Sequence, residues 1–362
     1  MNRRDAMKMA ALTAGAPGLS AAPAGGFQTE VKRLNLRHTW TTTMSSSEYR
    51  DVLYTRFSSG GITGHGEGAP IVRYKESAVE GQKVLEAIRD RISGLDPKRF
   101  AKELSAIFGQ IEGQYAAKAA LDIAVMDWVG QKLGVPIYQY LGLDPKDAPV
   151  TTFSIGMDKP EVIKQKVAEA EAFPVLKVKV GLNTDEEMIA SVRNATWKPL
   201  RVDANEGWTD REEAVRKINW LEKQGVEFIE QPMAADRLED ARYIRSKIHM
   251  PLFADEACRH ASDIPKLATA YDGVNIKLDK SGGILEAVRM IEVARACGLK
   301  VMLGCMISSS VSCTAAAMIS PLVDYADVDG FLLIGNDPFS GVKVDKGRLV
   351  LPTGPGLGLK PV

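Results

Sequence analysis

The sequence predicts an α/β protein built on a TIM-like barrel of eight parallel strands, with an α+β domain in front of it. Five charged residues, Lys179, Asp203, Glu230, Asp255 and Lys280, recur at intervals of 24, 27, 25 and 25 residues, and each closes a short apolar run. An interval of this length holds one strand, one helix and two short loops. Eight apolar runs follow residue 150, and eight strands close such a barrel.

The N-terminal part lacks this spacing and predicts an α+β domain over residues 25–145. Residues 31–37 and 49–57 are expected to be strands, and Gly60-Gly61 turns the chain back into ITGHGEG. Helical periodicity predicts three helices, at 77–92, 98–108 and 114–133.

The barrel is expected over residues 146–330. Its strands are predicted at 151–155, 175–180, 199–203, 227–230, 251–255, 273–278, 300–304 and 324–328. Helical stretches lie between them, as at 160–172, 210–223 and 283–297. The tail, residues 331–362, is rich in glycine and proline and is expected to return to the N-terminal domain.

Composition narrows the class of function. The chain has a formal net charge of zero, 45% hydrophobic and 25% charged residues, as is ordinary for a globular enzyme. This balance gives no reason to expect a nucleic acid or an anionic membrane as partner, and no apolar run is long enough to span a bilayer. The four cysteines form no CxxC pair, so they are expected to be small buried residues, with Cys305 alone near a site.

Residues 1–24 resemble a twin-arginine export signal. Arg3-Arg4 stand in the basic stretch MNRRDAMK, an Ala-rich stretch follows, and Ala22-Pro23-Ala24 offers a small-residue cleavage site. The alternative is a basic N-terminus with a chance arginine pair. The signal predicts a bacterial protein exported to the periplasm, and the cytoplasm is the expected location without it.

Three acids stand at the ends of consecutive predicted strands: Asp203, Glu230 and Asp255. The C-terminal ends of barrel strands meet at one rim, where catalytic residues of such barrels lie. Three carboxylates without a cysteine or histidine form an all-oxygen site that suits Mg²⁺ or Mn²⁺. A single acid here would be a helix cap or a salt bridge, but three in phase predict a metal site.

Lysines flank these acids on both sides. Lys177 and Lys179 are two residues apart on one strand and point to the same side. Burial and mutual repulsion are expected to lower their pKa values, which would make a general base. Lys280 is predicted to approach from the opposite side. Lys277 is its rival, but Lys280 keeps the 25-residue interval and precedes a Ser-Gly-Gly loop.

Together these segments resemble the enolase superfamily, in its muconate-lactonizing-enzyme subgroup. The matching segments are KVK at 177–179, VDAN at 202–205, IEQP at 229–232, ADE at 254–256 and NIKLDKSGG at 275–283. The resemblance implies a (β/α)7β TIM-like barrel with an N-terminal α+β capping domain. It also implies Mg²⁺ on Asp203, Glu230 and Asp255, with Mn²⁺ as a substitute. Lys179 and Lys280 would be the two bases, and Lys177 would neutralise the enolate oxygen.

The end of the eighth predicted strand points to the substrate. Asp327-Val328-Asp329 resembles the DxD element of dipeptide epimerases, in which the acids bind the α-ammonium group of the substrate. A strand-end turn with solvated acids is the alternative. Cys305 and Met306, after the seventh strand, are also expected to contact the substrate.

The substrate side chain is less well defined by the sequence. The loop at 41–48, TTTMSSSE, is expected to cover the site, but it holds no arginine for a side-chain carboxylate. Arg37, Arg50 or Arg73 could take that role. Without one of them, a small or hydrophobic side chain is expected.

The sequence therefore predicts a Mg²⁺-dependent isomerase that inverts the C-terminal α-carbon of an L-Ala-X dipeptide, such as L-Ala-D/L-Glu from murein. The alternatives are an o-succinylbenzoate synthase or N-succinylamino-acid racemase, a muconate-type cycloisomerase, and a periplasmic peptide-binding protein without activity. The expected partners are a small dipeptide and further copies of the chain in a homo-oligomer.

Overall fold

The computed structural model describes residues 25–362, and the predicted export signal, residues 1–24, lies outside them. The described chain begins with a three-stranded antiparallel sheet, β1 (Gly25–Thr41), β2 (Ser46–Ser59) and β3 (Ile62–Gly68). Gly60 and Gly61 join β2 to β3 with φ of 57° and 78°. Two positive φ values in a two-residue hairpin favour glycine, so this predicted turn is confirmed.

Four helices follow this sheet: α1 (Ala78–Ala87), α2 (Arg89–Ser93), α3 (Phe100–Phe108) and α4 (Tyr115–Leu133). The helix predicted over 77–92 is interrupted at Ile88, so it forms α1 and α2. The predicted helices at 98–108 and 114–133 are confirmed within two residues.

Helix α4 lies directly on strand β3 because every second residue of β3 is a glycine. A Cβ atom on Gly64, Gly66 or Gly68 would come within about 2 Å of a carbonyl oxygen of α4, those of Ala124, Ala120 and Ala116 respectively. The glycine stripe of β3, Gly64, Gly66 and Gly68, therefore lets a helix backbone touch a strand backbone. A closely packed interior of this kind tolerates no added atom.

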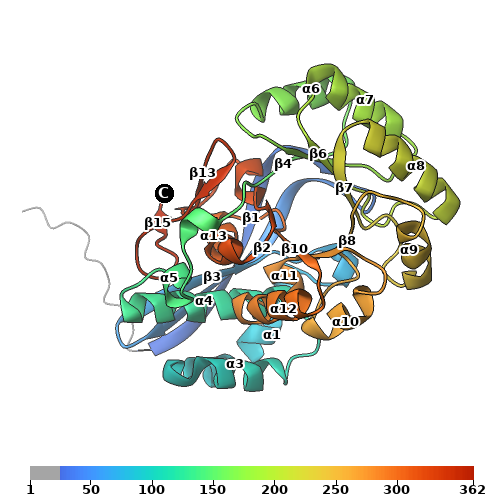
Figure 1. The fold of residues 1–362 in the computed structure, drawn as a ribbon. Helices are drawn as coiled ribbons and strands as arrows, with labels where there is room; N and C mark the ends of the chain where they lie inside the picture. Colours follow the sequence, from blue (N-terminus) through green and yellow to red (C-terminus); the bar gives the residue numbers. More distant parts are fainter. Residues whose placement is uncertain (1–24) are drawn as a thin grey trace, which may run out of the picture.

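The second unit is an eight-stranded parallel barrel (Figure 1). Its strands are β4 (Phe153–Ile155), β5 (Leu176–Lys179), β6 (Leu200–Asp203), β7 (Val226–Glu230), β8 (Leu252–Ala254), β9 (Gly273–Ile276), β10 (Lys300–Gly304) and β11 (Tyr325–Asp327). They pair in chain order, and a bridge between Thr151 and Ala326 joins the two outer strands. The predicted strand count, order and fold class are confirmed.

Helices alternate with these strands and cover the outside of the barrel. They are α6 (Pro160–Glu169), α7 (Asp185–Ala195), α8 (Arg211–Lys223), α9 (Leu238–Arg245), α10 (Ile264–Leu267), α12 (Ile284–Ala296) and α13 (Ser310–Ile319). A short helix α5 (Ile137–Tyr140) precedes the barrel.

Several barrel strands are one or two residues shorter than predicted, and the difference matters most at β9. The sequence predicts a strand over 273–278, but β9 ends at Ile276 and a one-turn helix, α11 (Leu278–Ser281), begins after Lys277. The chain therefore turns away from the barrel between Lys277 and Lys280.

The tail after residue 330 forms four short strands, β12 (Phe339–Ser340), β13 (Lys343–Asp345), β14 (Arg348–Val350) and β15 (Lys360–Pro361). Ile334 bridges to Leu36 of β1, and the amide of Leu357 donates to Asp127 of α4 at 2.7 Å. The tail thus contacts the elements that precede the barrel. The domain boundaries at 24/25, 145/146 and 330/331 stay predictions.

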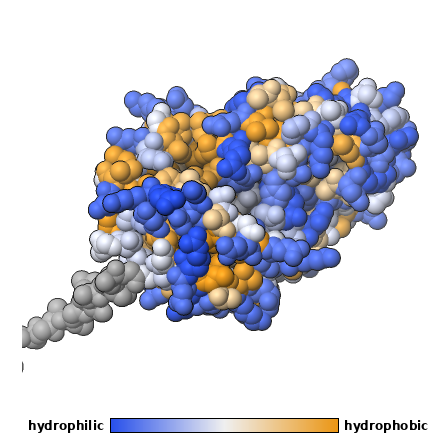
Figure 2. All heavy atoms as spheres, turned by 90° about the horizontal axis from the view of Figure 1, so that it is seen from below, coloured by the Kyte–Doolittle hydropathy of each residue, from blue (hydrophilic) through white to orange (hydrophobic). Residues whose placement is uncertain are grey.

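The surface is a mixture of hydrophilic and hydrophobic patches when seen from below (Figure 2). Trp197 and Val72 are among the large apolar side chains that are exposed. Among residues 25–362, none of the helices has both the length and the hydropathy that a membrane crossing requires.

Candidate active site

The candidate residues lie at the C-terminal ends of neighbouring barrel strands. Asp203 and Glu230 are the last residues of β6 and β7, and Asp255 directly follows β8. Lys177 and Lys179 lie on β5 at one side of these acids. Parallel strands bring their ends to one rim, so the sequence spacing becomes a spatial cluster.

The three acids form a compact, buried triad. One carboxylate oxygen from each of Asp203, Glu230 and Asp255 lies within 4.8 Å of the other two. Burial and the neighbouring Asp203 raise the pKa of Glu230 to about 7. Burial acts in the same direction on Asp255, but Lys277 and Lys280 hold the pKa of that carboxyl well below its usual range.

Lys177 lies beneath the triad and neutralises part of its charge. Its Nζ is 2.7 Å from Glu230 Oε2, 2.7 Å from Asp327 Oδ2 and 3.2 Å from Asp203 Oδ2. Burial acts to lower the pKa of Lys177, but these three carboxylates raise it well above the usual value. The expected lowering is therefore wrong for Lys177, because the surrounding acids outweigh both desolvation and the second lysine.

Two lysines flank the triad and line a cavity. Lys179 Nζ lies 2.6 Å from Asp203 Oδ2, and Lys277 Nζ lies 2.7 Å from Asp255 Oδ2. Strands β6, β7 and β8, which carry the acids, separate β5 from β9. The two ammonium groups therefore approach the cavity from opposite sides of the triad.

Lys280 has a different environment from Lys277. Its side chain is 1% exposed, and it does not line the cavity, whereas Lys277 does. The Lys280 ammonium pairs with Asp255 Oδ1 and donates to the carbonyl oxygens of Asp255 and Asn275 at 2.7 and 2.9 Å. Lys277, and not Lys280, therefore faces the cavity together with Lys179, because Lys280 lies on α11 after the strand has ended.

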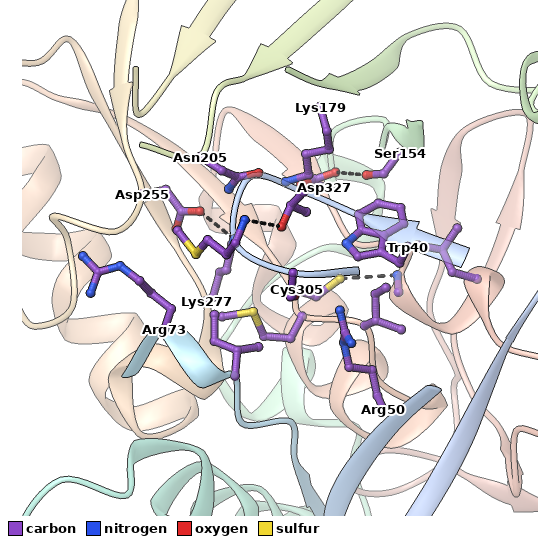
Figure 3. A pocket seen from close by; sticks show the side chains of 18 of the residues that line it. Trp40, Arg50, Arg73, Ser154, Lys179, Asn205, Asp255, Lys277, Cys305 and Asp327 are labelled. Atoms are coloured by element: carbon purple, nitrogen blue, oxygen red, sulfur yellow. Dashed lines mark hydrogen bonds and ion pairs between the residues drawn. The ribbon is translucent and has the colours of Figure 1, made fainter. Parts of the chain in front are cut away.

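The cavity, of about 110 Å³, lies between the barrel rim and the N-terminal part of the chain (Figure 3). Thr42, Met44 and Ser45 line it, so the loop expected to cover the site does reach it. Cys305 and Met306 line it from the barrel side, and their contact with a substrate stays a prediction. Ser154, Asn205 and Glu256 also line it and were not expected from the sequence.

Glu256 and Asn205 form a polar pair beside the triad. Asn205 Nδ2 donates to Glu256 Oε1 at 3.1 Å, and burial with the nearby Asp255 raises the pKa of Glu256 to about 8. Both residues stand in segments that the sequence analysis quoted, VDAN and ADE. Their position one or two residues after a triad acid is the signal that could have identified them.

Asp327 and Asp329 both line the cavity next to Lys179. Asp327 accepts hydrogen bonds from Thr152 and Lys177, and Asp329 accepts one from the backbone amide of Ser154 at 2.6 Å. Burial and the charge of Asp327 raise the pKa of Asp329 to about 7. A cation placed beside Asp329 would favour its charged form, so this pair suits an ammonium group.

Of the three arginines considered, Arg50 and Arg73 line the cavity and Arg37 does not. Arg73 is engaged by Glu206, with Nη2 2.8 Å from Oε1. Within residues 25–362, Arg50 has no carboxylate partner and donates only to the carbonyl oxygen of Tyr49 at 3.2 Å. Figure 3 shows Arg50 on the side of the cavity away from Lys179.

The triad fits a hard divalent cation. It offers only oxygen ligands, which Mg²⁺ prefers, and Glu230 Oε2 is buried and, apart from its ion pair with Lys177, has no hydrogen-bond partner among the described residues. A divalent cation would compete with Lys179 and Lys277 for the same carboxylates. Its binding would weaken these ion pairs and favour the loss of a proton from either lysine.

Comparisons with known proteins agree with this geometry. Residues 28–142 match the family described as mandelate racemase / muconate lactonizing enzyme, N-terminal domain, and residues 162–362 match enolase C-terminal domain-like. The L-Ala-D/L-Glu epimerase of Bacteroides thetaiotaomicron is 40% identical over 90% of this chain and 85% of its own length. The L-Ala-D/L-amino acid epimerase of Pedosphaera parvula is 41% identical over 90% and 96%.

A solved structure has the same fold over almost the whole described chain. The dipeptide epimerase of Enterococcus faecalis, complexed with Mg and L-Leu-L-Tyr, superimposes with a TM-score of 0.86. It is 32% identical in sequence, and the alignment covers 92% of this chain and 98% of that one. The chain thus belongs to the enolase superfamily, among the proteins with a mandelate racemase / muconate lactonizing enzyme N-terminal domain.

Proposed function

We propose that this protein is a Mg²⁺-dependent dipeptide epimerase that inverts the α-carbon of the C-terminal residue of an L-Ala-X dipeptide. The observation that carries the proposal is the pair of lysines, Lys179 and Lys277, on opposite sides of a carboxylate triad. Inversion at carbon needs proton removal on one face and proton delivery on the other. The similarity to curated dipeptide epimerases supports the choice of substrate.

The chain's own residues divide the work between them. Asp203, Glu230 and Asp255 would hold Mg²⁺, and when bound the ion would supply positive charge to the substrate carboxylate. Lys179 Nζ and Lys277 Nζ exchange the α-proton on the two faces, each as base in one direction and acid in the other. Lys177 adds positive charge beneath the site, and Asp327 with Asp329 binds the α-ammonium group.

The structure of the cavity supports an acidic side chain at the C-terminal residue. Two arginines line the cavity, Arg50 and Arg73. Arg73 pairs with Glu206, whereas Arg50 has no carboxylate partner among residues 25–362. Its guanidinium could take a side-chain carboxylate in a bidentate pair. L-Ala-D/L-Glu, which can arise from murein, is therefore the substrate that we propose first.

Proton NMR in D₂O tests the reaction directly. The purified protein with Mg²⁺ is incubated with a panel of L-Ala-L-X dipeptides, and the α-proton signal of the C-terminal residue is followed. We expect loss of this signal and growth of a second diastereomer. If no dipeptide exchanges its α-proton while Mg²⁺ is bound, the proposal is wrong.

Asp329 separates the epimerase from the other reactions of similar sites. An o-succinylbenzoate synthase, an N-succinylamino-acid racemase or a muconate-type cycloisomerase has no substrate ammonium group to bind at Asp329. Asp329→Asn should therefore raise KM for a dipeptide by about 10-fold or more. An N-succinylamino acid that reacts equally well with both forms of the protein would favour the racemase, and tight dipeptide binding without exchange would favour a binding protein.

Export to the periplasm through the twin-arginine signal at residues 1–24 is also part of the proposal. Arg3-Arg4, the Ala-rich stretch and Ala22-Pro23-Ala24 support it. A periplasmic location would place the protein beside the murein peptides that the reaction requires.

A further inference from the structure

A second cavity lies away from the active site, between helices of the N-terminal part and helices of the barrel. It measures about 270 Å³, and none of its lining residues also lines the active-site cavity. Helices α3 and α4 form one wall, and α11 and α12 form the other. Its polar lining residues include Lys118, Asp122, His260, Ser281, Glu286 and Arg289.

Lys118 is the feature of this cavity that calls for a ligand. It stands in the first turn of α4 and is only 7% exposed. Within residues 25–362, the ammonium has no hydrogen bond and no ion pair, and it lies over the face of the Tyr115 ring, with the centroid at 4.5 Å. The charge that acts on its pKa is the Glu76 carboxylate, which accepts hydrogen bonds from the amides of Tyr115 and Ala116. A buried cation without a counter-ion is costly, and burial lowers the pKa of Lys118 accordingly.

The two acids that line the cavity, Asp122 and Glu286, form no ion pair with Lys118, although Asp122 Oδ1 is buried without a hydrogen-bond partner among the described residues. Asp122 Oδ2 accepts a hydrogen bond from the Ile284 amide at 2.6 Å, and burial raises the pKa of Asp122 to about 7. Glu286 accepts from the Ala261 amide at 3.1 Å and pairs with Arg289. Neither acid neutralises Lys118, so the cavity keeps a site for negative charge.

Further positive and aromatic groups surround this site. The centroids of the His260 and Tyr115 rings lie 4.5 Å apart. The Arg259 guanidinium lies 5.0 Å from the centroid of the Tyr115 ring and 4.5 Å from that of the Tyr74 ring. Arg259 Nε is buried without a hydrogen-bond partner among the described residues. Tyr74 lines the active-site cavity and Tyr115 lines the second cavity, so Arg259 contacts one ring from each cavity.

We infer that this second cavity, the Lys118 cavity, binds a small oxyanion, with a carboxylate or phosphate group held by the Lys118 ammonium. The inference does not depend on the proposed epimerase reaction. A charge-assisted hydrogen bond from Lys118 to the anion would supply the direct ion pair that Lys118 lacks among the described residues. Because Ser281 and Gly282 of the cavity wall follow Lys280 in sequence, the bound anion would touch the segment that carries Lys277 and Lys280.

Calorimetric titration of the full-length protein with Mg²⁺ tests this inference, with inorganic phosphate and succinate as separate probes. We expect at least one probe to bind, and the probe that binds identifies the chemistry. Lys118→Met should lower its affinity about tenfold or more. Lys132→Met is the matched control, because Lys132 is exposed in the last turn of the same helix, and it should bind like the unmodified protein.

An active-site variant shows whether the probe has bound elsewhere. Asp203→Asn should keep the affinity for the probe, because Asp203 does not line the Lys118 cavity. Binding that is lost in Asp203→Asn but kept in Lys118→Met would assign the probe to the active site and overturn the inference. Absence of binding of both probes to the unmodified protein would overturn it as well.

Thermal unfolding provides a second readout. In buffer without oxyanions, Lys118→Met should unfold at a higher temperature than the unmodified protein, because it removes an unpaired buried charge. The probe should raise the Tm of the unmodified protein and leave that of Lys118→Met unchanged. Lys118→Gln replaces the methionine variant if the latter does not fold. An equal rise of Tm in both proteins would contradict the assignment.

Discussion

Lys277 and Lys280 stand three residues apart, yet their ammonium groups have different neighbours. Lys277 directly follows β9 and lines the cavity, whereas Lys280 lies on α11 with two backbone carbonyls and Asp255 around it. The sequence interval favoured Lys280 because a strand was expected to continue to residue 278. The one-turn helix α11 that follows the strand determines which of the two lysines lines the cavity.

Substitution of these two lysines should therefore give different losses. Lys277→Ala removes a general base, so we expect kcat for epimerisation to fall by about 10²–10⁴-fold with the fold intact. Lys280→Ala leaves Asp255 Oδ1 and the carbonyl oxygens of Asp255 and Asn275 without their buried donor, although Lys277 still pairs with Asp255 Oδ2. We therefore expect a loss of about 3 kcal/mol in the free energy of unfolding.

Rates from α-proton exchange and unfolding curves in urea measure the two effects. With Lys277→Ala, Lys179 should still exchange the α-proton of one diastereomer with solvent. If Lys280→Ala folds normally but loses all exchange on one face, while Lys277→Ala epimerises normally, the two roles are reversed.

Arg50 should determine the preference for an acidic side chain. Arg50→Met removes the guanidinium, and we expect kcat/KM for L-Ala-L-Glu to fall by about 10–100-fold, the value of a charge-assisted hydrogen bond. The rate with L-Ala-L-Leu should change little. Arg56→Met, at an exposed position of β2, is the control. A parallel loss with both dipeptides would show that Arg50 supports the loop rather than the substrate.

Glu230 should make Mg²⁺ binding depend on pH near neutrality. Burial and Asp203 raise its pKa from 4.5 to about 7 in the metal-free protein, so a proton competes with the metal below that value. We expect the affinity for Mg²⁺ to fall by up to about tenfold per pH unit as the pH drops below 7. Calorimetry at several pH values measures it, and Glu230→Gln should lose this dependence.

The same raised pKa fixes the sign of the effect of Glu230 on stability. Because the folded state binds the proton more tightly than the unfolded chain, the metal-free protein loses stability as the pH rises from about 4.5 through about 7. Saturating Mg²⁺ should offset this loss. The Tm of the metal-free protein is measured from about pH 4.5 to about 7 for both forms. If the Tm of Glu230→Gln rises relative to that of the unmodified protein as the pH increases, the predicted sign is correct. Identical pH dependence of the two Tm values would contradict it.

At the level of elements, two carboxylates from the N-terminal part hold the starts of two barrel helices. Asp122 of α4 accepts from the first residue of α12, and Glu67 of β3 accepts from the Ser309 amide at 2.9 Å and the Ser312 amide at 3.0 Å. Acids at helix N-termini satisfy amides that have no partner within the helix. These contacts join β3 and α4 to the barrel across the interface.

Removal of the Glu67 carboxylate should loosen this interface. Glu67→Ala leaves the amides of Ser309 and Ser312 buried without partners, so we expect a loss of about 2–4 kcal/mol in the free energy of unfolding. Chemical denaturation measures the loss. Glu112→Ala, at an exposed position, should change stability little, and an equally small effect of Glu67→Ala would show that water can replace the carboxylate.

For the whole molecule, the regular spacing of charged residues predicted the barrel and its triad, whereas local sequence did not predict where single helices and strands end. The eight barrel strands, their order and the carboxylate triad followed from an interval of about 25 residues, because each repeat must complete one strand and one helix. The interruption at Ile88 and the end of β9 at Ile276 could not be predicted, because neither has a glycine or proline to mark it. The direction of the Lys177 pKa shift could not be predicted either, because it depends on Asp203, Glu230 and Asp327, which only the fold brings together.

The location of the protein can be tested on the whole chain. If residues 1–24 are a twin-arginine signal, Arg3→Lys combined with Arg4→Lys should keep the protein in the cytoplasm of a bacterial host, whereas the unmodified chain should appear in the periplasm. Fractionation and immunoblotting measure this. A cytoplasmic location of both forms would contradict export. The homo-oligomer expected from sequence stays a prediction, which sedimentation would test.

The cavity has walls from two sources, and this has a practical consequence for redesign. The lysines and acids come from strand ends of the barrel, whereas Trp40, Met44 and Arg50 come from the β1–β2 hairpin. The hairpin residues contribute no ligand to the triad. Transplanting residues 40–50 from a relative with another substrate should therefore change which dipeptide is accepted while leaving the proton-transfer machinery in place, so selectivity can be evolved separately from catalysis.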